Sequence, residues 1–154
     1  MDLFELLLTI HVLAAVIWVG GATITQVFAV RANRSDDPTK IAGFARDAEW
    51  VGTRIFLPMS LILVATGFGI VADAEFYELG EAWIIIGLAA WAASVVTGAA
   101  FLGPESGRIA AAIDRDGPES PDAQRRISRI FVISRIELLV LMIIVVDMVV
   151  KPGA

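Results

Sequence analysis

The chain has 154 residues, of which 57% are hydrophobic, and a formal net charge of −5. Soluble domains are about 45–50% apolar, so the composition indicates an integral membrane protein, and the length fits a single transmembrane domain over residues 1–154. The absence of cysteine excludes disulfides, thiolate nucleophiles and iron–sulfur clusters, and the acidic charge argues against a nucleic-acid-binding protein.

The first predicted membrane helix covers about residues 3–30. It has no charged residue from Leu6 to Val30, and about 20 apolar residues are enough to cross the hydrocarbon core. The apolar run is longer than the core of a signal peptide, and Asp2 and Glu5 precede it in place of basic residues. We therefore interpret it as a retained membrane helix.

His11, the only histidine of the chain, lies inside this first helix. An intramembrane ionisable residue indicates a functional site by default, and neutral imidazole is a common ligand of haem iron and other metals. The alternative is an interhelical hydrogen bond, worth about 0.6 kcal/mol in bilayers. Trp18 follows on the same helical face, and Gly20 and Gly21 would allow a close approach of another helix or a flat ligand.

Three further membrane helices are predicted at about residues 55–72, 82–102 and 130–150. Before the second span, a short interfacial helix is predicted from the helical spacing of Ile41, Phe44, Ala48 and Val51. Between the third and fourth spans we expect one or two helical turns and a flexible stretch rich in Gly, Pro and Ser. The expected fold class is an all-α, integral membrane four-helix bundle.

The basic residues predict the orientation of this bundle. The connections before the second span and after the third span contain, or directly adjoin, most of them: Arg31, Arg34, Lys40, Arg46, Arg54, Arg108, Arg115, Arg125, Arg126 and Arg129. By the positive-inside rule, we expect these connections to be two cytoplasmic loops, and we expect the N-terminus and the C-terminus to lie outside.

The fourth predicted span carries three ionisable residues. Arg135 is expected to snorkel to headgroups, and Asp147 lies near the outer interface. Glu137 lies near mid-bilayer, where a structural hydrogen bond and a catalytic role are both open. Met142 and Met148 offer thioethers as iron ligands, although filling gaps in packing is the commoner role of methionine.

Four segments resemble a family of small bacterial integral membrane proteins of unknown function: HVLAAVIWVGG, RIFLPMSLILVATGFGI, FLGPESGRIA and SRIELLVLMIIVVDMVVKPG. This resemblance implies a multi-pass protein of the bacterial plasma membrane. A more distant resemblance is to HemJ-type protoporphyrinogen oxidases and copper-resistance D membrane domains. It depends on His11, Trp18, Gly20 and Gly21 in the first helix, and on Glu137, Lys151 and Pro152 in the last.

The distant resemblance implies a membrane redox protein that binds haem b, with His11 as the axial metal ligand. A six-coordinate haem would need a second ligand from Met142, Met148, a substrate or the His11 of a second copy in a homodimer. The HemJ type has an Asn-Glu pair where Ile136 precedes Glu137 here, and also an intramembrane lysine that this chain lacks. The sequence therefore leaves open whether the protein is an enzyme.

Two other functions are open. The small residues of the third span favour a non-catalytic accessory or structural subunit of a larger membrane complex. The copper-resistance resemblance suggests a transporter or metal-handling protein, although one histidine and a few methionines make a poor copper site. The lipid bilayer is the expected environment of the chain in each case.

Overall fold

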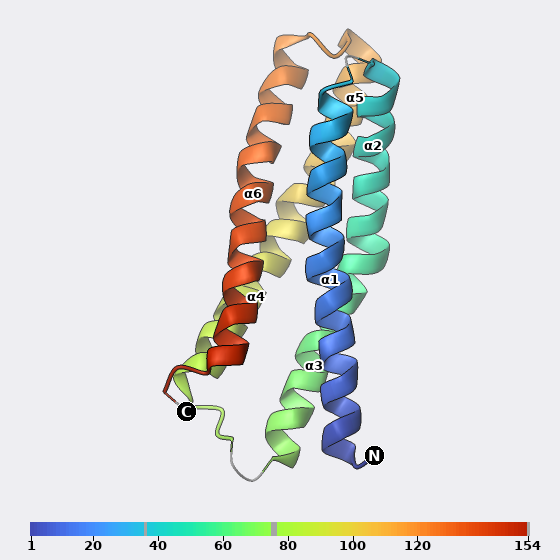
Figure 1. Cartoon of the computed structure of the whole chain (residues 1–154). Helices are drawn as coiled ribbons and strands as arrows, with labels where there is room; N and C mark the ends of the chain where they lie inside the picture. Colours follow the sequence, from blue (N-terminus) through green and yellow to red (C-terminus); the bar gives the residue numbers. More distant parts are fainter. Residues whose placement is uncertain (36, 75–76, 154) are drawn as a thin grey trace.

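The computed structural model describes residues 1–35, 37–74 and 77–153. Within them the chain forms the helices α1 (Leu3–Asn33), α2 (Pro38–Val51), α3 (Leu57–Asp73), α4 (Ala82–Thr97), α5 (Gly103–Asp116) and α6 (Pro121–Val150). Two π-helical segments join α2 to α3 and α4 to α5, namely Gly52–Phe56 and Gly98–Leu102. Figure 1 shows four long antiparallel columns, with both termini and the α3–α4 connection at one end of the bundle.

Local sequence signals explain where the helices begin. The Asp2 side chain accepts a hydrogen bond from the Glu5 backbone N–H at 2.7 Å, and the Glu5 side chain accepts one from the Asp2 backbone N–H at 3.2 Å, which is a capping box. Ser120 caps α6 through the Ala123 backbone N–H at 3.3 Å. Both α2 and α6 have proline in the first turn, where its missing N–H costs little.

Three of the four columns are long and apolar enough to cross a membrane: Leu3–Asn33, Pro38–Asp73 and Ala82–Asp116. The fourth column, α6, has 30 residues, but its apolar part contains Arg135, Glu137 and Asp147. At 1.5 Å per residue α1 extends about 46 Å, whereas the hydrocarbon core is about 30 Å thick. The α1 helix is therefore longer than the hydrocarbon core is thick.

The helix predicted before the second span is confirmed, whereas the segment after the third span is more helical than predicted. The predicted interfacial helix is α2, which continues through Gly52–Phe56 into α3 and runs along the bundle (Figure 1). The segment after the third span contains the 14-residue helix α5 instead of one or two turns. Pro104 does not interrupt α5 because it lies in its first turn.

We use the name polar extension for α2, α5 and the adjoining ends of α1 and α6. Its core consists of small and branched residues: Ala42, Ala45, Ile109, Ala110, Ala112, Ile113, Ala123 and Ile127. In the other half of the bundle many apolar side chains face outward, as Val16 and Leu139 do at 62% and 63% exposure. This is the pattern of a bundle that is surrounded by lipid over part of its length and by water over the rest.

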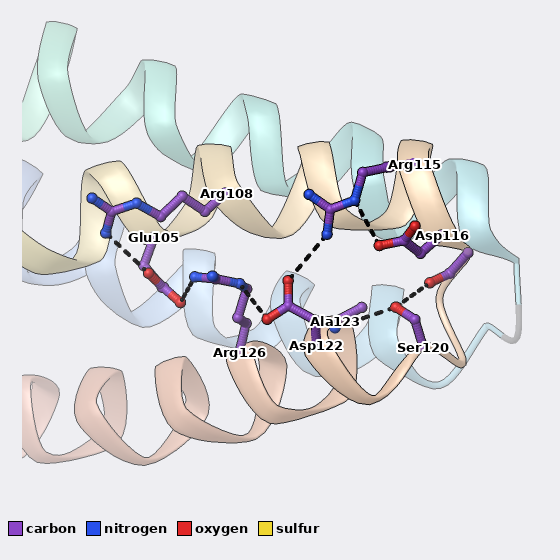
Figure 2. A network of polar contacts seen from close by, with 9 residues as sticks. Glu105, Arg108, Arg115, Asp116, Ser120, Asp122, Ala123 and Arg126 are labelled. Atoms are coloured by element: carbon purple, nitrogen blue, oxygen red, sulfur yellow. Dashed lines mark hydrogen bonds and ion pairs between the residues drawn. The ribbon is translucent and has the colours of Figure 1, made fainter.

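A network of ion pairs joins α5 to α6 in the polar extension (Figure 2). Glu105 is 3% exposed and accepts hydrogen bonds from Arg126 Nη1 at 2.8 Å and from Arg108 Nη1 at 3.2 Å. Arg126 Nε also donates to Asp122 at 3.1 Å. The hydrogen bonds to Asp122 and Glu105 raise the pKa of Arg126 above its ordinary value. The buried carboxylate is therefore charge-paired on both of its oxygens.

Glu81 organises the connection between α3 and α4 at the opposite end. Its carboxylate accepts hydrogen bonds from the Glu78 backbone N–H at 2.9 Å and from the Trp83 indole. Lys151 lies over the rings of Tyr77 and Trp83 and donates a hydrogen bond to the Tyr77 hydroxyl. The hydrogen bonds from Glu78 and Trp83 lower the pKa of Glu81 below its usual 4.5.

We expect the packing of Trp83 to depend on pH through Glu81. Because the folded-state pKa is lowered, ionised Glu81 contributes stability above pH 4.5, and this contribution is lost as the pH falls through the lower folded value. The tryptophan fluorescence of the wild type should therefore change in this acidic range. The variant Glu81→Gln should lack that transition, and an identical transition in the variant would refute the assignment.

Candidate functional site

The His11 side chain connects α1 to α3. Its Nδ1 lies 2.9 Å from the backbone carbonyl oxygen of Leu63 and 3.2 Å from Thr66 Oγ1. A carbonyl oxygen can only accept, so Nδ1 carries the proton in this arrangement. The ring lies close to Gly67, where a Cβ atom would be 3.3 Å from the imidazole. The structural role that the sequence left open, an interhelical hydrogen bond, is therefore present.

The other residues predicted to bind a cofactor lie apart from His11. The Met148 methyl group lies against Gly87 of α4, and Met142 is 41% exposed. Gly21 lies against the Phe56 ring, and no atom lies within 4 Å of a Cβ placed on Gly20.

The hydrogen bond from Nδ1 of His11 to the Leu63 carbonyl is the kind that commonly orients a histidine that binds a metal through Nε2. Since Nδ1 is engaged with Leu63, only Nε2 could bind iron. The Met148 side chain is directed at α4, so the structure does not bring this thioether to the imidazole. Among the residues that the structure describes, no group of three or more His, Cys, Asp or Glu side chains could hold a metal ion.

A cavity of about 410 Å³ lies inside the bundle, and all four columns line it. Its wall on α1 runs from Trp18 to Asn33, which corresponds to about 22 Å along the helix axis. Most of the lining is apolar, with aromatic rings contributed by Trp18, Phe44, Phe56 and Phe131. The cavity therefore extends from the membrane half of the bundle into the polar extension.

Polar side chains from three columns lie together in the membrane half of this cavity. Ser134 Oγ on α6 donates to Gln26 Oε1 on α1 at 3.0 Å. Gln26 Nε2 is buried and has no hydrogen-bond partner in the described part of the chain. If the amide group is flipped, Nε2 and Oε1 exchange positions and Oε1 becomes the atom without a partner. One polar atom of Gln26 therefore lacks a partner in either orientation.

Ser94 and Glu137 complete the polar group. Ser94 is 2% exposed and interacts with the Glu137 carboxyl group, although its Oγ makes no hydrogen bond of normal geometry with a described residue. Glu137 lines the cavity and is partly buried. We name Gln26, Ser94, Ser134 and Glu137 the polar cluster. Buried polar atoms without partners are rare in native proteins, which makes this cluster the best candidate for a binding site.

The two π-helical segments form part of the cavity wall. Each begins with glycine and is followed by proline six positions later, Gly52 before Pro58 and Gly98 before Pro104. In each, the residue before the proline donates its N–H to the carbonyl of that glycine, five positions back. This wider turn accommodates the missing N–H of proline without breaking the column, and π-segments occur often at functional sites.

The structure thus brings two of the predicted site residues, Trp18 and Glu137, to one cavity and places His11 elsewhere. Sequence reasoning missed the other members of the polar cluster: Gln26, Ser94 and Ser134. The signal that could have found them is a set of uncharged polar residues at similar depth in three apolar spans. The paired Gly-x5-Pro spacing could likewise have indicated the π-helical segments.

A family model described as "Predicted integral membrane protein (DUF2269)" matches residues 5–152, nearly the whole chain. No curated protein and no solved structure matches.

Proposed function

The chain belongs to the DUF2269 family of predicted integral membrane proteins, and we propose that it binds one small amphipathic molecule in the cavity inside its bundle. The main support for this proposal is the buried Gln26 amide, whose Nε2 has no hydrogen-bond partner among the described residues. Gln26 and Glu137 line the same largely apolar cavity. A ligand with an apolar body and one hydrogen-bonding group would satisfy that amide and fill the space around it.

The dimensions of the cavity support this proposal. Sites for small molecules typically measure about 300–1,000 Å³ and combine apolar walls with a few placed polar groups. The cavity of about 410 Å³ falls within that range. Its polar cluster lies in the membrane half, whereas the lining toward the polar extension carries no charged side chain and is mostly apolar, with Ile41, Ala45 and Ile109 beside the uncharged polar residues Asn33 and Ser106. An elongated ligand would place its polar group at Glu137 and its apolar part toward the polar extension.

We further propose that α6 is the fourth membrane span, over residues 130–150. It packs along α4, and its outer surface is apolar at Val132, Ile136 and Leu139, which are 55%, 57% and 63% exposed. The positive-inside rule supports a cytoplasmic polar extension, with both termini on the other side of a bacterial plasma membrane.

Haem b at His11 and an accessory role in a larger complex remain the alternatives from the sequence. Haem has the weaker support because Met148 is directed at α4 and so does not offer a second ligand at His11, although the hydrogen bond from Nδ1 to Leu63 is compatible with iron at Nε2. A reduced-minus-oxidised absorption spectrum of protein produced with haem available separates the alternatives. A b-type signal that is lost in His11→Ala would support haem, whereas a colourless protein would exclude it. An accessory role would be supported by co-purification with a defined larger protein.

Quenching of Trp18 fluorescence by ω-bromododecanol tests the proposed function. Trp18 lines the cavity and is 8% exposed, so a surrounding detergent micelle reaches little of it. We expect a saturable component of quenching that disappears in Trp18→Phe. The matched variant Trp50→Phe, which removes a side chain that is 57% exposed, should retain that component. Quenching that only rises in proportion to the probe, and equally in both variants, would refute binding in the cavity.

A further inference from the structure

We infer that the ligand of the cavity is a lipophilic cation whose positively charged group pairs with Glu137. This inference deepens the proposed function and depends on it. The ligand is then an alkylammonium or a similar cation with an apolar body. The shape of the cavity alone does not determine this charge.

The charge of the cavity wall favours a cation. Glu137 is the one ionisable side chain among the described residues that line the cavity. A carboxylate at membrane depth is energetically costly unless a positive charge or a wet cavity accompanies it. The wall supplies no positive charge of its own, so a cationic ligand would complete the pair.

Arg135, the basic residue nearest to Glu137 along α6, interacts with another side chain. Arg135 is exposed, and its guanidinium lies over the Phe131 ring, 5.6 Å from the centroid. Within the described residues no ion pair connects Arg135, or any other basic side chain, to Glu137. Ser94 interacts with the Glu137 carboxyl group, but a hydroxyl is uncharged. The carboxyl group therefore keeps its capacity to bind a cation.

The aromatic rings and the Gln26 amide of the cavity wall also suit a cation. An ammonium group is attracted to the face of an aromatic ring, most strongly to tryptophan, and the cavity offers Trp18, Phe56 and Phe131. The Gln26 amide can present its oxygen to an N–H donor when its nitrogen bonds to Ser134. An anionic ligand would meet Glu137 without any basic partner in the described wall, which disfavours that class.

The experiment compares two probes that have the same chain and different charge, ω-bromododecyltrimethylammonium and ω-bromododecanol, by the saturable quenching of Trp18 at equal mole fractions in a neutral detergent. We expect the cation to bind at least tenfold more tightly than the alcohol. Glu137→Gln should lose at least tenfold in affinity for the cation and keep its affinity for the alcohol, which shows that the variant still forms the cavity. Asp147→Asn, which changes a carboxylate of α6 outside the cavity, should behave as the wild type.

The outcomes separate this inference from the proposed function. Equal affinity for both probes, or unchanged cation binding in Glu137→Gln, would overturn the cationic ligand and leave the cavity as a site for an uncharged amphiphile. If neither probe gives saturable quenching of Trp18 in the wild type, the proposed function fails and the inference fails with it.

Discussion

Replacing Arg126 with methionine is expected to lower the free energy of unfolding by about 2–3 kcal/mol. The substitution leaves the Glu105 carboxylate, which is 3% exposed, without its closest positive partner. Removing one partner of a buried ion pair typically costs about 3–5 kcal/mol because the other charge stays buried. The lower figure applies here because the Arg126 side chain is 32% exposed and Arg108 still contacts Glu105.

Arg115→Met is the matched control in the same network (Figure 2). The Arg115 side chain is 65% exposed and pairs with Asp116 and Asp122, which are also largely solvated. Surface pairs of this kind contribute about 0–1 kcal/mol. Unfolding of both variants in detergent, followed by circular dichroism, should show the larger loss for Arg126→Met. Equal losses would mean that the burial of Glu105 does not determine the stability of the polar extension.

Gly21→Ala is expected to destabilise the membrane half of the bundle by about 1–3 kcal/mol, the usual cost of overpacking. A Cβ atom at Gly21 would lie 2.6 Å from the Phe56 ring, so the ring has to shift to accommodate it. Gly20→Ala is the control, since no atom lies within 4 Å of its Cβ position. Alanine there should be neutral or slightly stabilising because it favours the helix more than glycine does.

The double variant Gly21→Ala with Phe56→Leu identifies the contact responsible. If the clash with the ring causes the loss, the smaller leucine side chain should restore part of the stability that Gly21→Ala removes. Thermal unfolding of the single and double variants in the same detergent provides the comparison. Additive losses would show that the alanine acts through another neighbour.

Hydrophobicity alone was enough to predict the three helices that are long and apolar enough to cross a membrane, because an apolar run of about 20 residues has few other structures available. The full extent of the helices around Ile41 and after Gly103 was harder to predict. Their charges and prolines are typical of loops, yet a helix tolerates both when proline lies in its first turn and the charged face meets water. The columns continue through π-helical segments. This continuation depends on backbone geometry that the composition does not encode.

The candidate site could be predicted only in part, for a different physical reason. Glu137 and Trp18 stand out as polar or aromatic residues within apolar spans. Whether such residues meet depends on which helices pack together and in what rotation. The packing of α1 against α3 gives His11 a partner at Leu63, and the approach of α6 to α1 joins Ser134 to Gln26. A lone histidine was the strongest signal in the sequence, but the polar cluster formed elsewhere.

Native mass spectrometry of the detergent-purified protein with dodecyltrimethylammonium tests most directly whether the cavity binds a ligand. We expect one bound molecule per wild-type chain and none for Ala22→Phe, since Ala22 lines the cavity and a phenyl ring there would occupy it. Val16→Phe, at a position that is 62% exposed, should bind as the wild type does. Equal occupancy in the wild type and both variants would contradict binding inside the bundle and place the amphiphile on the outer, lipid-facing surface.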